Sequence, residues 1–133
     1  MRFMLLQYYG EVGSGCVPMW QWTPEEIKAH IDFQIALNAA LTESGEFIDA
    51  QGLAGPEEAK IVTSDGVNPP VVTDGPYPET KELVAGYRMI DVESLDRAIE
   101  IAALAAAAPG AGGAPIQDFI EVRQVMGAPE PEV

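Results

Sequence analysis

This sequence is poor in basic side chains, in cysteine and histidine, and in long apolar runs. It has 7 Lys and Arg against 21 Asp and Glu in 133 residues, a formal net charge of −14. Such a charge repels nucleic-acid phosphates and anionic lipid, so we expect neither nucleic acid nor a membrane among the partners. One cysteine excludes an internal disulfide, and the acidic residues show no metal-ligand spacing. We therefore predict no metal and a reducing, cytoplasmic location.

The same shortages exclude other classes of protein. No apolar run approaches the roughly 18 residues that a membrane-spanning helix requires. The opening MRFMLLQYYGE has one Arg and a short apolar run that soon meets a glycine and an acid, unlike a secretory signal. The segment Gly13-Ser14-Gly15 lacks the lysine and the helix start of a phosphate-binding loop. With no dinucleotide, haem or flavin fingerprint, we predict no cofactor.

The hydrophobic periodicity changes along the chain in a regular order. Runs typical of strands lie at 3–8, 46–53, 60–63, 71–73, 83–92 and 119–126. Segments 24–44 and 95–108 have the spacing of helices. This order predicts an α+β fold, a ferredoxin-like βαββαβ arrangement with an extra hairpin and both helices on one face of an antiparallel sheet. We expect a single domain over 1–126 and a loose acidic tail over 127–133.

The first helix has a well-defined start. Thr23 can cap it, Pro24 needs no amide partner at the first position, and Glu26 can bond back to the cap. The wide apolar face expected for this helix comprises Ile27, Ile31, Phe33, Ile35, Leu37 and Leu41. For the second helix we expect a shared face of Leu95, Ala98, Ile99, Ala102 and Ala105.

The first strand is apolar at both parities, so both faces of the sheet need cover. Two helices can cover only one face, and we therefore predict a homodimer that packs sheet against sheet. In the last strand, parity assigns Glu121 and Arg123 to this open face. We expect Arg88 there too, because a guanidinium buried under the helices is costly without an acid beside it. Glu121 and Arg123 then form either an ion pair at the dimer seam or part of a site for a small organic anion.

One loop is unusually dense in functional groups. Residues 73–82 read TDGPYPETKE, in which an Asp-Gly turn and two prolines stiffen a polar segment. This segment resembles the DGPF-motif proteins of the YciI-like (YCII-related) family, whose signature is a Thr-Asp-Gly-Pro-Phe stretch followed by Glu-Thr-Lys-Glu. RFMLLQYYG, SGEFIDAQGL, LVAGYRMIDVESLDRAIEIA and FIEVR extend the resemblance over nearly the whole chain. The resemblance implies a dimeric α+β barrel but no settled reaction.

The candidate catalytic residues are Asp74 in this loop and His30 on the first helix. Asp74 can serve as a general base or acid, or can simply close its turn. His30, the only histidine, lies on the helix equivalent to the one that carries a histidine proposed as catalytic in smaller relatives, about one turn farther from Gly45 than the resemblance implies. The alternative is that His30 is a packing residue. The candidate ligand-binding residues are Thr73, Tyr77, Glu79, Lys81, Arg88, Glu121 and Arg123.

Two functions from different classes fit these features. The first is binding of a small organic molecule in a pocket formed by the loop and the open sheet face, with cofactor-free proton transfer or elimination if the ligand is transformed. The second is a non-enzymatic regulator associated with an alternative sigma factor, because many family members resemble products encoded beside such factors. The sequence does not decide whether the protein is an enzyme.

Overall fold

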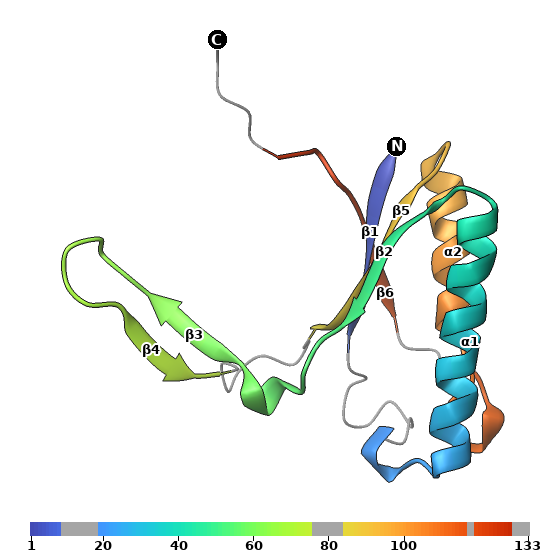
Figure 1. The fold of residues 1–133 in the computed structure, drawn as a ribbon, viewed down its shortest axis with the longest axis horizontal. Coiled ribbons are helices and arrows are strands. Elements are labelled where there is room, and N and C mark those ends of the chain that lie inside the picture. Colours follow the sequence, from blue (N-terminus) through green and yellow to red (C-terminus); the bar gives the residue numbers. More distant parts are fainter. Residues whose placement is uncertain (9–18, 76–83, 117–118, 129–133) are drawn as a thin grey trace.

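A computed structural model describes residues 1–8, 19–75, 84–116 and 119–128 (Figure 1). The longer elements are β1 (Arg2–Tyr8), α1 (Pro24–Glu43), β2 (Phe47–Gly52), β3 (Lys60–Thr63), β4 (Val71–Asp74), β5 (Val84–Asp91), α2 (Leu95–Ala106) and β6 (Ile120–Gln124). Single 3-10 turns are η1 (Met19–Gln21), η2 (Pro56–Glu58) and η3 (Ala111–Gly113). All the strands and helices expected from the sequence are present, with bounds that differ by a few residues.

The main sheet has four antiparallel strands in the order β2-β5-β1-β6. Each helix connects two strands that have a third strand between them, so the fold contains two interlocked split βαβ units. Figure 1 shows α1 and α2 side by side on one face of this sheet. The ferredoxin-like βαββαβ arrangement is thereby confirmed. None of the described helices has the length and apolar content to cross a membrane.

The hairpin formed by β3 and β4 projects away from the main sheet, on the side opposite the helices (Figure 1). Its strands pair from Lys60 with Asp74 to Thr63 with Val71. In its turn, the Asp65 carboxylate accepts hydrogen bonds from the backbone N–H groups of Val67 and Asn68, at 2.9 and 2.8 Å. The extra hairpin predicted from the sequence is confirmed.

Helix α1 begins with the capping box expected from its sequence. The backbone N–H of Glu26 donates to Thr23 Oγ1 at 3.1 Å, and the N–H of Thr23 donates to Glu26 Oε1 at 2.8 Å. Pro24 occupies the first position. The helix ends before Gly45, whose positive φ of 80° favours glycine.

The core lies between the sheet and the two helices. Its buried members include Phe3 and Leu5 of β1, Ile90 of β5, Leu41 of α1, and Ala98, Ile101 and Ala102 of α2. Two expectations about helix faces are wrong in part. Ile31 and Ile35 are 49% and 61% exposed, and Leu95 and Ile99 are about half exposed. The apolar stripes are wider than the surface facing the sheet, so their outer residues lie in solvent.

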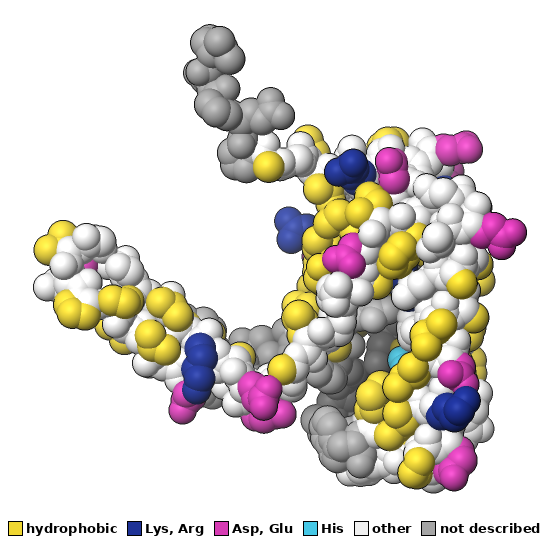
Figure 2. Space-filling model, in the orientation of Figure 1, with side chains coloured by type: hydrophobic (Ala, Val, Ile, Leu, Met, Phe, Trp, Pro, Cys, Tyr) yellow, Lys and Arg dark blue, Asp and Glu magenta, His cyan; other side chains and the backbone are white. Residues whose placement is uncertain are grey.

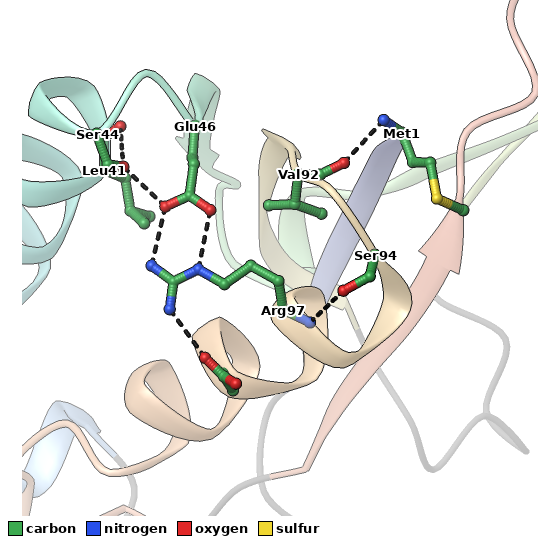
Figure 3. Close-up of polar contacts among 8 residues, drawn as sticks. Met1, Leu41, Ser44, Glu46, Val92, Ser94 and Arg97 are labelled. Carbon is green, nitrogen blue, oxygen red and sulfur yellow. Dashed lines mark hydrogen bonds and ion pairs between the residues drawn. The ribbon is translucent and has the colours of Figure 1, made fainter.

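An ion pair joins the start of β2 to helix α2 (Figure 3). Arg97 Nε and Nη2 each donate to a carboxylate oxygen of Glu46 at 2.8 Å, and Nη1 contacts Glu100 at 3.0 Å. The hydroxyl of Ser44 also donates to Glu46, at 2.7 Å. The Glu46 side chain is only 16% exposed, and Arg97 is 36% exposed. The hydrogen bonds from Arg97 lower the pKa of Glu46 from its ordinary 4.5 to about 2.

Glu46→Gln is expected to lower the free energy of unfolding at neutral pH by about 1–2 kcal/mol, since Arg97 is partly exposed and therefore partly screened by water. The folded-state pKa of Glu46 lies below its unfolded value. The stabilisation is therefore present above about pH 4.5 and disappears as the pH falls through about 2. Urea unfolding of wild type and variant across this range measures the difference. Glu100→Gln is the control, and an equal loss in both variants would contradict the dominant role of Glu46.

Candidate functional site

The sheet face opposite the helices carries a polar pair within an apolar surface. Glu121 and Arg123 of β6 lie on this face, directly opposite Leu6 and Met4 of β1. Arg123 Nε is 3.6 Å from Glu121 Oε1, and the side chains are 72% and 42% exposed. Ile120 and Val122, at the other parity, pack against the core. The parity prediction for this strand is confirmed, whereas a ligand-binding role for the pair stays a prediction.

Two aromatic side chains border this polar pair. The hydroxyl of Tyr8 lies 3.4 Å from Glu121 Oε2. The ring of Tyr8 stacks on that of Phe119, with ring centroids 5.1 Å apart. The open face therefore offers aromatic rings, a carboxylate and a guanidinium side by side.

The prediction that Arg88 lies on the open sheet face is wrong. Arg88 lies on the helix side of β5 and is only 3% exposed. Its Nε donates to Asn38 Oδ1 at 2.8 Å, and its Nη2 donates to Gln34 Oε1 at 2.6 Å. The expectation assumed that a buried guanidinium requires an acid, but two neutral amide oxygens of α1 accept these bonds. Desolvation lowers the pKa of this guanidinium.

His30 lies near the N-terminal end of the same helix and is half-buried. Its Nδ1 is 3.0 Å from the carbonyl oxygen of Pro109, and the ring meets Trp22 edge to face at 5.4 Å. A carbonyl oxygen only accepts hydrogen bonds, so Nδ1 is the donor. The ring Nε2 lies 3.5 Å from the amide nitrogen of Gln34, which can only donate.

His30, Gln34 and Asn38 are spaced four residues apart and form a polar stripe on α1, in which Gln34 and Asn38 bond Arg88. The hydrogen bonds link His30 through the Gln34 amide to the guanidinium. Among the described residues, Arg88 Nη1 is a buried side-chain atom without a hydrogen-bond partner. Our reading of the sequence missed Gln34 and Asn38. The signal was there, because the three polar residues interrupt the apolar periodicity of the helix at one angular position.

Asp74 ends strand β4 at the base of the hairpin. Its carboxylate lies 2.5 Å from Lys60 Nζ, and both side chains are mostly exposed. Thr73, beside it, pairs with Ile61 and is exposed. Figure 1 shows β4 and α1 on opposite sides of the main sheet, so the fold does not bring Asp74 and His30 together within one chain. The candidates Tyr77, Glu79 and Lys81 lie outside the described residues.

A shallow depression of about 300 Å³ lies where the hairpin meets the main sheet. It is lined by Leu53, Ala54, Gly55, Pro56, Glu58, Ala59 and Val84. The N–H of Gly75, directly after Asp74, donates to the carbonyl of Ala59 at 2.8 Å. Val84 is the first residue described after position 75. Gly75 and Val84 therefore both lie at the depression, Gly75 through its bond to Ala59 and Val84 as a lining residue. Within the described ranges, no cluster of three His, Cys, Asp or Glu side chains is suited to a metal ion.

A ferredoxin-like α+β unit with an added hairpin, whose last strand ends at Asp74 beside an apolar depression, defines the class of this protein. The chain belongs to the YCII-related family, because the family model of the YCII-related domain matches residues 1–125. It is also similar to an uncharacterized protein of Rhizobium meliloti (strain 1021), with 31% identity over 81 residues. That match spans 61% of this chain and 64% of the relative, less than two thirds of the relative's length.

Asp74→Asn is expected to change the free energy of unfolding by less than about 1 kcal/mol, because its ion pair with Lys60 is exposed. Chemical denaturation of the variant beside wild type gives the value. Lys60→Met, which removes the other partner, serves as the companion variant. A loss of several kcal/mol in Asp74→Asn would show that this residue holds the fold rather than serving a site.

Proposed function

We propose that this YCII-related protein binds a small organic molecule in the depression beside the Asp74-Gly75 turn. The observation that carries the proposal is the position of this depression, which lies beside Gly75, directly after Asp74, and is lined by Val84. Its volume of about 300 Å³ is at the lower end of ligand pockets. Mostly apolar walls with a few polar groups nearby are the usual composition of a small-molecule site.

The lining indicates the character of the ligand. Glu58 alone among the lining residues carries a charge, and the others are apolar or glycine. Such walls bind an apolar body through burial of surface. The polar contacts would come from residues 73–82, in which Thr73, Tyr77, Glu79 and Lys81 are the predicted ligand-binding residues.

The chemistry we propose for this site is cofactor-free proton transfer or elimination. Asp74 is better placed than His30 to act as the base, because it adjoins the depression through Gly75. His30 lies on α1 and hydrogen-bonds Pro109 on the helix side of the sheet. An aspartate can accept a proton from a bound ligand in such a reaction.

Leu53→Asp is expected to weaken small-molecule binding at least tenfold, because it places a charge in the apolar wall. The measurement is ligand-observed NMR with a panel of small aromatic and branched aliphatic compounds. Val67→Asp is the matched control, since Val67 is 89% exposed and lies in the hairpin turn away from the depression. The proposal fails if no compound binds wild type, or if Leu53→Asp binds the panel unchanged.

We also propose that two copies pack their open sheet faces together. Met4, Leu6 and Met89 lie on this face and are only partly buried within one chain. A second copy would cover them, and the Glu121–Arg123 pair would then lie at the seam. Apolar sheet surface of this kind is typical of an interface between subunits.

Met4→Lys is expected to convert the dimer to a monomer, because it buries an unpaired charge in the proposed interface. Sedimentation at micromolar concentration measures the mass of the particle. Ile35→Lys introduces the same charge on the outer side of α1, where the side chain is 61% exposed, and should leave the dimer intact. A wild-type protein that sediments as a single chain would refute the dimer.

A further inference from the structure

The guanidinium of Arg88 is buried between β5 and α1 with one end unsatisfied. Its Nε and Nη2 are bonded to the amide oxygens of Asn38 and Gln34, at 2.8 and 2.6 Å. Nη1 has no partner among the described residues, although the side chain is only 3% exposed. Two N–H bonds of a permanently charged group are therefore withdrawn from water without replacement.

No carboxylate in the described part of the chain forms an ion pair with this guanidinium. The side chains that bond it from α1 are the neutral amides of Gln34 and Asn38, and Gln34 also contacts His30. A buried positive charge without a counter-charge is costly, and replacing it by a well-packed apolar residue is commonly neutral or stabilising. The cost is offset if an anion occupies the site when the protein works.

We propose that Arg88 Nη1 binds the carboxylate of a small organic acid between α1 and β5. One buried positive charge balances one negative charge, which favours a monocarboxylate over a dianion such as phosphate. A planar carboxylate also matches the N–H geometry of a guanidinium. The Gln34 amide, whose N–H group now has only a long 3.5 Å contact with His30, can donate to the second oxygen.

The polar stripe beside this position extends toward the surface of the protein. The polar stripe runs along α1 from Asn38 toward His30, which is half-buried rather than enclosed. Figure 2 shows the histidine side chain, in cyan, partly exposed at the surface. The site shares no lining residue with the depression beside Asp74. The proposal therefore goes beyond the proposed function, and either can fail without the other.

The experiment measures thermal unfolding of the full chain in sodium acetate, in inorganic phosphate and in sodium chloride at equal ionic strength. Acetate should raise the midpoint temperature by about 4 °C for each tenfold increase above its dissociation constant. Phosphate should raise the midpoint no more than chloride does.

Two variants test the residue assignment. Arg88→Met should remain folded, because Met fills similar space, and should lose the acetate effect. Gln34→Glu places a carboxylate of the protein beside the guanidinium, where the Gln34 amide oxygen now lies 2.6 Å from Nη2. This variant should therefore unfold at a higher midpoint temperature without acetate and should no longer respond to acetate. Arg2→Met is the matched control, since Arg2 is an exposed strand arginine, and it should retain the response.

The proposal is overturned if wild type shows no acetate response, or if the response persists in Gln34→Glu or in a folded Arg88→Met. An equal response to phosphate would refute the assignment to a monocarboxylate. If Arg88→Met does not fold, Gln34→Glu decides the outcome alone. The NMR panel with Leu53→Asp reports separately on the depression, so failure at one position is distinguishable from failure at the other.

Discussion

Side chains alternate between the two faces of the antiparallel sheet, and the helices cover one of those faces. Phe3 and Leu5 of β1 and Ile90 of β5 turn toward the helices and form most of the sheet's share of the core. Met4 and Leu6 necessarily turn the other way. Because β1 and β5 occupy the centre of the sheet, this single alternation determines where the core lies, which face is open, and on which side each charged strand residue must stand.

The same alternation explains why Arg88 interrupts the core. It shares its parity with Gly86 and Ile90, so a change of face would require a register shift of the whole strand. The helix opposite supplies amide oxygens rather than apolar side chains at that level. Bonds from Gln34 and Asn38 satisfy the guanidinium only in part, and the hydrophobic layer between sheet and helices therefore has a polar segment.

Local signals predicted the elements well, because each depends on residues close in sequence. Thr23 to Glu26 contain the whole capping box, and the alternation along β6 is enough to assign Glu121 and Arg123. Long-range geometry was less accessible. The partners of Arg88 lie about fifty positions away in the sequence. The charge of Arg88 predicted an acidic partner, and nothing local indicated that two neutral amides would accept its hydrogen bonds instead. The exposure of Leu95 and Ile99 depends on the rotation of α2 about its own axis against the sheet. The spacing of apolar residues in the sequence does not determine that rotation.

The β3–β4 hairpin is expected to be less stable than the four-stranded sheet. In the described structure β3 and β4 pair with each other and not with the four-stranded sheet. Two-stranded ribbons are marginal by themselves, and most of this hairpin's side chains are exposed. It can open without breaking a hydrogen bond of the main sheet. Amide hydrogens of β3 and β4 should therefore exchange with solvent through local opening, long before those of β1 and β5, which exchange only when the whole domain unfolds.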